Sequence, residues 1–276
     1  MIAGLLAMIA ASACGKKEVS GTGKKNEVIQ VHHFYVAEEG ADVADGSIRT
    51  PWRTINSALS KIRAGDTVIV RGGTYSEKIT FPRSGLPGKP VVLIAYPGER
   101  PLIDGSNLTV NGWEALVTFT NARYIEMNGF DIANFKTSVK GADPEGIRID
   151  GNAKGISIRN CAIYQIQNEA SLENWRSAHA ILVLGNGTAA ITGIEITGCT
   201  VHDTKTGTSE NITLAGNLDG FKVTRNKVYN TENIGIIIAD GGGLYPKGDP
   251  ATNFARNGVV SDNILYNVSM ANSVDI

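Results

Sequence analysis

The sequence has few aromatic residues and almost no excess of charge of one sign. Phe, Trp and Tyr make up 7% of the 276 residues, and the formal net charge at pH 7 is −1. Binding to nucleic acid phosphates needs a basic surface, so this balance argues against nucleic acid as a partner. Glycine, in contrast, is abundant with 32 residues, which is typical of a fold with many turns and little helix. The length suits one large β-domain.

No apolar run near the N-terminus is long enough to cross a membrane. Residues 2–13 are apolar or small, whereas a membrane-spanning helix needs about 20 such residues. The run suits a signal peptide, and the small residues before Cys14 resemble a bacterial lipoprotein cleavage site. We expect residues 1–14 to direct export and Cys14 to carry a lipid that anchors the protein at the outer membrane or cell surface. The alternative is an ordinary signal peptide that releases a periplasmic or secreted protein.

After this segment, a short phrase recurs along the chain. "RNKVYN" from Arg225 has relatives in "RNCAIYQI", "TGCTVHDT" and "SDNILYNV", each with Asn or Cys, one residue, an aliphatic residue and then Tyr or His. The aliphatic positions are 132, 163, 201, 228 and 265, which are 31, 38, 27 and 37 residues apart. A core phrase that survives such insertions predicts a solenoid.

Each repeat contains three short segments in which apolar and polar residues alternate, as in 147–150 and 156–158. Alternation of this kind predicts strands, and three strands per repeat predict a parallel β-helix, an all-β fold, over residues 31–276. Ahead of the coils, Thr54 is a suitable N-cap for a helix whose apolar residues would cap the open end of the solenoid. Residues 15–30 are polar and Gly-rich, and we expect a flexible tether.

The coil sequences resemble a known group of enzymes. "GDTVIVRGGTYSEKITF" (65–81) and "GKPVVLIAYPGERPLIDG" (88–105) are similar to the N-terminal coils of secreted right-handed β-helix polysaccharide lyases, notably families 9 and 6. The resemblance extends over about residues 34–268. It implies a right-handed β-helix and an extracellular polysaccharide such as pectate, alginate or chondroitin as the partner.

In the resembled fold, one turn carries an inward ladder of polar side chains. The matching positions here are Cys161, Cys199, Asn226 and Asn263. The two cysteines would lie one coil apart, and we favour free buried thiols over a disulfide because parallel stacking gives a poor S–S torsion. The ring positions Tyr164, His202, Tyr229 and Tyr266 point outward. They either stack on one another or offer a platform for sugars.

The chemistry implied by the resemblance is β-elimination at a uronic acid. It needs a cation that neutralises the substrate carboxylate, usually Ca²⁺ held by carboxylates, and a basic residue that abstracts a proton. The three Asp positions of the family 9 calcium site match Asn233, Ile234 and Ile237 here. Asp219 and Asp240 remain as weak candidate ligands, so Ca²⁺ is the one cofactor we consider.

Candidate site residues follow from the outward positions and from the long loops after each third strand. Such loops would wall a groove, where aromatic rings suit sugar stacking and cations suit acidic sugars. On the second strand, Glu195 and Lys222 are expected to form an ion pair. The catalytic candidates are Lys222, Arg148, Asp150 and His179. The substrate-binding candidates are Trp175, Arg176, His202, Tyr229, Tyr245, Lys247 and Arg256.

The functional expectation is a lyase-like enzyme acting on uronate glycans. Two alternatives stay open: a non-catalytic carbohydrate-binding or surface-interaction protein, and a hydrolase or epimerase that uses carboxylates in the loop groove. The sequence stops at "SMANSVDI", inside what is expected to be a further coil, so we expect the β-helix to be C-terminally incomplete or covered by a partner. With its further coils, the protein is expected to be a monomer.

Overall fold

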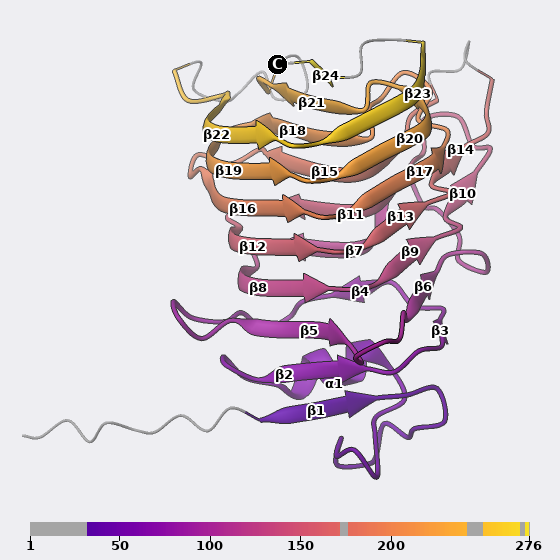
Figure 1. The fold of residues 1–276 in the computed structure, drawn as a ribbon, viewed down its shortest axis with the longest axis vertical. Coiled ribbons are helices and arrows are strands. Elements are labelled where there is room, and N and C mark those ends of the chain that lie inside the picture. Colours follow the sequence, from indigo (N-terminus) through magenta and orange to yellow (C-terminus); the bar gives the residue numbers. More distant parts are fainter. Residues whose placement is uncertain (1–31, 172–175, 242–250, 271–273, 276) are drawn as a thin grey trace, which may run out of the picture.

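The computed structural model describes residues 32–171, 176–241, 251–270 and 274–275. Within this part of the chain, short strands wind into a solenoid whose coils stack along one axis (Figure 1). A full coil has one strand in each of three sheets, and each strand pairs in parallel with its equivalent in the next coil. The predicted parallel β-helix is therefore confirmed. The expected signal peptide, Cys14 and the tether lie outside the described residues.

Three long sheets run the length of the solenoid. The first sheet contains β4 (Ile79–Thr80), β7 (Trp113–Thr120), β11 (Asp143–Asp150), β15 (His179–Gly185), β18 (Ile212–Gly216), β21 (Ile236–Ala239) and β24 (Val274–Asp275). The second contains β1 (His33–Val36), β2 (Thr67–Val70), β5 (Val91–Ala95), β8 (Arg123–Asn128), β12 (Lys154–Arg159), β16 (Ile191–Thr197), β19 (Leu218–Thr224) and β22 (Ala255–Ser261). The third contains β3 (Thr74–Tyr75), β6 (Leu102–Asp104), β9 (Asp131–Ala133), β13 (Ala162–Tyr164), β17 (Thr200–Thr204), β20 (Lys227–Asn233) and β23 (Ile264–Met270). A two-stranded sheet pairs β10 (Lys136–Thr137) with β14 (Gln167–Asn168).

The core fills the space that the three sheets enclose. Ile147 of β11 stacks between Val117 and Ile181 of the neighbouring coils, and all three side chains are fully buried. The other inward residues predicted from the alternation, Ile149, Ile156, Ile158 and Ile163, are equally buried. Strands β11 and β15 begin earlier than the alternation indicated, at Asp143 and His179 instead of residues 147 and 181. These extra residues matter for the site.

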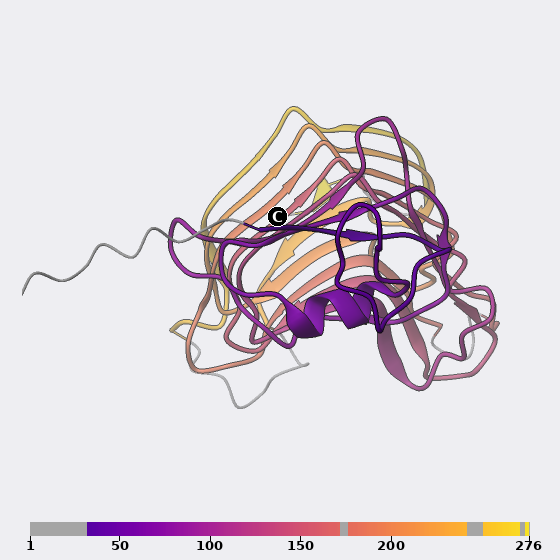
Figure 2. The ribbon, with the colours of Figure 1, turned by 90° about the horizontal axis from the view of Figure 1, so that it is seen from below.

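A single described α-helix covers the N-terminal end of the solenoid (Figure 2). Helix α1 runs over Ile55–Lys61, and the side chain of Thr54 accepts a hydrogen bond from the Ser57 N–H at 3.2 Å. The predicted N-cap is thus confirmed, and the helix buries Ile55, Ala58 and Leu59 against the first coils. Among the described residues, no helix is long and apolar enough to cross a membrane.

The turn between the second and third sheets holds the predicted polar ladder. Asn226 Oδ1 accepts from the Cys199 N–H at 2.9 Å, and the Asn226 N–H donates to Asn263 Oδ1 at 2.9 Å. Cys161 and Cys199 are buried free thiols, as expected. Each rung satisfies backbone groups that the turn would otherwise leave unpaired inside the protein.

Candidate functional site

A break in the strand alternation brings charged residues together on the outer side of the first sheet. Ile147 is fully buried, and a Cβ atom at Gly146 would lie 2.6 Å from Ile163 Cγ2. Two consecutive positions therefore face the core, so Glu145 and Arg148 both point outward although they are three residues apart. Only glycine fits at position 146, because the same Cβ would also lie 2.5 Å from the Ala180 carbonyl oxygen.

The position of Glu145 is occupied by a different side chain in each coil. Glu145 is in register with Ala115 of β7 and with His179 of β15. Ile181 pairs with Ile212 in the next coil, which places Glu210 beside His179. His179 Nδ1 lies 3.0 Å from the Glu210 carbonyl oxygen. We call Glu145, His179 and Glu210 the charged column.

Glu145 and Arg148 form a buried ion pair at the base of this column. Arg148 Nε donates to Glu145 Oε2 at 2.6 Å, and the Arg148 Nη2 group contacts Oε1. Burial raises the pKa of Glu145, and the Arg148 charge opposes that shift. Burial alone would lower the pKa of Arg148, but its bonds to Glu145 raise it overall. Asp150, a further outward residue of β11, lies 4.0 Å from Arg148 Nη1 and accepts from Thr120 Oγ1 at 2.6 Å.

His179 is held as a cation by its acidic surroundings. Its Nε2 lies 3.5 Å from Asp143 Oδ2, and Ser177 Oγ donates to that same oxygen at 2.6 Å. Burial by itself lowers the pKa of His179, but the charges of Asp143 and then of Glu145 and Glu210 raise it to about 9. At neutral pH the imidazole is therefore protonated and can donate a proton.

A pocket of about 490 Å³ opens over Asp143 and His179, within the size range of small-molecule sites. Its floor is an outward apolar cluster of Leu182, Leu184 and Ala215. Trp113, which is 51% exposed, stands at its rim. The loop residues that wall it are Ser177, Thr208, Ser209 and Glu210. The pocket thus combines an apolar surface, an exposed ring and a proton donor.

The structure brings two of the predicted catalytic residues close to this pocket and separates a third from it. His179 lines the pocket, and Arg148 is bonded to Glu145, the residue in register with His179. Lys222 lies on β19 in the second sheet, with its side chain exposed. The predicted ion pair of Lys222 with Glu195 was wrong, because Glu195 Oε2 is bonded to Arg159 Nη2 at 2.6 Å.

The outward rings of the third sheet stack on one another. Tyr164, His202, Tyr229 and Tyr266 have centroids 4.9, 5.0 and 5.0 Å apart and interplanar angles of 8°, 9° and 3°. Each inner ring has both faces covered, so His202 and Tyr229 offer no open face to a sugar. Of the two alternatives for this column, the structural stack is the one observed.

The cationic loop candidates are held by acids and amides. Arg176 donates to both carboxylate oxygens of Glu232 at 2.6 Å. Arg256 donates to Asn217 Oδ1 at 3.0 Å, and its Nε lies 3.4 Å from Asp219 Oδ2. The remaining substrate-binding candidates, Trp175, Tyr245 and Lys247, lie outside the described residues.

The two candidate calcium ligands do not form a metal site with the described residues. Asp219 is paired with Arg256 and accepts from Asn257 Nδ2 at 2.7 Å. Asp240 is exposed at the end of the first-sheet strand that precedes it. Within the described ranges, no three His, Cys, Asp or Glu side chains are grouped so that they could hold a metal ion. These carboxylates do not fit Ca²⁺, and no reaction step is derived through it.

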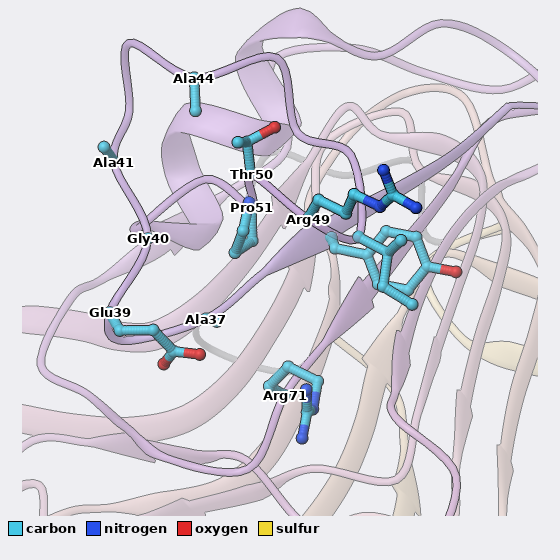
Figure 3. Close-up of a pocket in the computed structure, with 11 residues that line it drawn as sticks. Ala37, Glu39, Gly40, Ala41, Ala44, Arg49, Thr50, Pro51 and Arg71 are labelled. Carbon is cyan, nitrogen blue, oxygen red and sulfur yellow. The ribbon is translucent and has the colours of Figure 1, made fainter.

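A second cavity lies at the N-terminal end of the solenoid. It measures about 310 Å³ and is lined by the loop after β1 together with Arg71 (Figure 3). Arg71 is already bonded to Glu99 at 2.8 Å and lies over the Tyr96 ring. None of the predicted site residues lines this cavity.

Sequence reasoning missed most residues around His179. Asp143, Glu145 and Glu210 were absent from the predicted site, as were Ser177 and Trp113. One signal was present in "DPEGIRID" (143–150), where two acids precede a glycine that interrupts the alternation of a predicted strand. An interruption of that kind is a known mark of functional positions in sheets.

Comparison with known proteins places this fold among right-handed β-helices. A family model described as "Pel9A-like, right handed beta helix region" matches residues 34–228. The protein YwoF of Bacillus subtilis is 33% identical over 236 residues, covering 85% of this chain and 48% of YwoF. Pectate lyase PEL9 of Emericella nidulans is 30% identical over 152 residues, covering 50% of this chain and 36% of that enzyme. The chain spans about half the length of the curated relatives it matches, or less.

A solved structure supports the fold alone. The GH136 lacto-N-biosidase from Eubacterium ramulus superposes with a TM-score of 0.59 at 13% sequence identity. The match covers 88% of this chain and 55% of the biosidase. Identity this low carries no statement about activity.

Proposed function

The chain belongs to the Pel9A-like right-handed β-helix family, and from that premise we propose that it recognises and processes an extracellular polysaccharide in the first-sheet pocket. One arrangement carries the proposal: His179 lies beside Asp143, which raises its pKa, and faces a pocket with an apolar floor and an exposed Trp113. Sugar rings present apolar faces and polar edges, and such a pocket complements both.

The geometry supplies one step that two reaction classes share. Elimination and hydrolysis of a glycosidic bond both require a proton on the departing oxygen. His179 Nε2 carries that proton and passes it to the oxygen as the C–O bond breaks, which leaves a neutral imidazole. Asp143, 3.5 Å away, favours the protonated imidazole before the transfer and orients its ring.

Lyase-type processing of a uronate glycan is the first candidate, supported by the family and by pectate lyase relatives. Hydrolysis is the second, and a specific observation favours it: Asp143 and Glu210 bring carboxylates to the same pocket as the proton donor. In a hydrolase, a carboxylate activates the water that attacks the sugar carbon.

The deciding experiment incubates the protein with pectate, alginate, chondroitin and neutral plant glycans, with and without Ca²⁺. Elimination yields new reducing ends together with unsaturated products that absorb in the near ultraviolet. Hydrolysis yields reducing ends without that absorbance. Retention of a glycan in affinity electrophoresis with neither product supports the non-catalytic alternative and overturns processing.

The role of His179 is tested in the same assay. His179→Gln removes the transferable proton, and we expect about 10²–10⁴-fold lower activity. Lys154→Ala, an exposed change on the second sheet, is the matched control and is expected to keep full activity. A folded His179→Gln protein with unchanged activity would remove His179 from the mechanism.

Export accompanies this proposal, since an extracellular polysaccharide is met outside the cell. We propose a lipid anchor on Cys14. Cys14→Ser is expected to abolish fatty-acid labelling and membrane retention in a bacterial host. Labelling that persists in this variant would overturn the anchor and favour the ordinary signal peptide.

A further inference from the structure

One carboxylate oxygen in the pocket lacks a hydrogen-bond donor. Asp143 lines the pocket and its side chain is 3% exposed. Its Oδ2 accepts from Ser177 Oγ at 2.6 Å, whereas its Oδ1 is buried and has no partner among the described residues. A buried acceptor without a donor is costly, and native proteins rarely leave one unless a ligand or a bound water completes it.

Each of the two cations near Asp143 has an acid as its charge partner. His179 Nδ1 lies 3.0 Å from the Glu210 carbonyl oxygen and its Nε2 faces Asp143 Oδ2. Arg148 is bonded through Nε and Nη2 to Glu145. Among the described residues, a ligand carboxylate placed over Asp143 would therefore meet like charge and find no cation that lacks an acidic partner.

A second acid in the pocket, Glu210, adds to the negative charge that a ligand carboxylate would meet. Glu210 is half-buried at the wall, and its Oε2 lies 3.4 Å from Thr213 Oγ1. Both acids line the cavity, while the floor of Leu182, Leu184 and Ala215 is apolar. Acceptors above an apolar floor suit a ring that carries O–H or N–H donors on its edge.

We propose that this pocket binds a neutral sugar residue whose hydroxyl or amide group donates a hydrogen bond to Asp143 Oδ1. The inference rests on the proposed glycan-binding function and narrows its substrate class. A polysaccharide processed here contains neutral residues next to the cleaved bond. Polymers built only of uronate are poor substrates, because each residue that enters the pocket brings a carboxylate to Asp143 and Glu210.

The test measures binding of three monosaccharides by saturation-transfer NMR and titration calorimetry at neutral pH. Galactose and N-acetylglucosamine are expected to bind, and galacturonate is expected to bind about tenfold more weakly or worse. The methyl ester of galacturonate keeps the hydroxyl groups and loses the charge, so it is expected to recover the affinity of galactose. This comparison needs no variant and is independent of any folding defect.

Asp143→Asn then assigns the effect to this residue. Removing its charge is expected to narrow the preference for galactose over galacturonate by about tenfold. Glu126→Gln is the matched control, because Glu126 is a half-buried acid of the second sheet and should leave the preference unchanged.

Two results would overturn the proposal. One is galacturonate binding as tightly as galactose; the other is no binding of any of these sugars. Either result leaves the proposed function standing if polysaccharide is still cleaved in the product assay. Loss of cleavage with intact binding of neutral sugars would instead overturn processing and keep this site.

Discussion

Two outward columns of the same solenoid differ in how their side chains are satisfied. On the third sheet, Tyr164, His202, Tyr229 and Tyr266 repeat one kind of side chain, and each ring stacks on the next at about the coil spacing. On the first sheet, the charged column places a different group in each coil. When one kind of side chain repeats, its members contact one another along the column. The residues of the charged column instead need partners from other positions.

The energetics of the two columns differ accordingly. Stacked rings add favourable contacts with little desolvation of polar atoms. Glu145 and His179 are instead almost fully removed from water, which is favourable only while each charge keeps its partner. The ring column therefore stabilises the fold. The stability of the charged column depends on each charge keeping its partner, as is expected of a functional site.

The largest loss of stability is expected when one partner of the buried Glu145–Arg148 ion pair is removed. Arg148→Met leaves Glu145 buried and uncompensated, and we expect the free energy of unfolding in urea to fall by about 3–5 kcal/mol at neutral pH. The double variant Glu145→Gln with Arg148→Met removes both charges and should recover most of that loss. A single variant that loses less than about 1 kcal/mol would show that the pair is not desolvated.

The second effect is a dependence of stability on pH that comes from His179. Its pKa is raised in the folded protein to about 9 from 6.5, so folding favours the bound proton. The resulting stabilisation is complete below about pH 6.5 and is lost as the pH rises through about 9. Urea unfolding from pH 6 to pH 10 should show a loss on the order of 3 kcal/mol.

His179→Gln is the reference for this measurement. The variant lacks the titrating group, so its stability should change much less over the same pH range. Equal pH profiles of the two proteins would show that His179 is not held as a cation by Asp143.

The sequence predicted the repetitive parts of this structure well, for a physical reason. Inward isoleucines, the Asn226 ladder and the ring column repeat at equivalent positions, so each coil is evidence for the next. The helix cap at Thr54 was predictable because N-capping is local. All of these features were confirmed by burial, hydrogen bonds or ring geometry.

The candidate site was predicted only in part, since it lies where the repeat is broken. Arg148 was predicted as an outward strand residue and His179 as a residue of the loop before the next strand. Glu145 was not predicted, because strict alternation from Ile147 would turn it to the inside. Gly146 shifts the alternation, and no local sequence pattern shows whether the residues before it face the core or the outside. An ion pair of Lys222 with Glu195 was predicted because the two residues are in register. Arg159, one coil before Glu195, binds that carboxylate instead.

A smaller effect is expected in the ring column. Tyr229→Ala removes two ring contacts, at 5.0 Å to His202 and 5.0 Å to Tyr266, and should lower the free energy of unfolding by about 1–3 kcal/mol. Tyr229→Phe keeps the ring and should stay within about 0.5 kcal/mol of the parent protein. Glycan cleavage by Tyr229→Phe should be unchanged. A selective loss of activity in that variant would return this column to the binding surface.

The smallest effect is expected from Glu195, which forms an ion pair like that of Glu145 but in contact with water. Its bond to Arg159 is 2.6 Å long, and the two side chains are 25% and 33% exposed. Water and salt screen such a pair, so Glu195→Gln should cost about 0–1 kcal/mol, and less at high ionic strength. Thermal unfolding in low and high salt measures this change beside Arg148→Met. Equal losses for the two variants would mean that burial does not set the cost of losing an ion pair, and the charged column would be no more sensitive than the exposed surface.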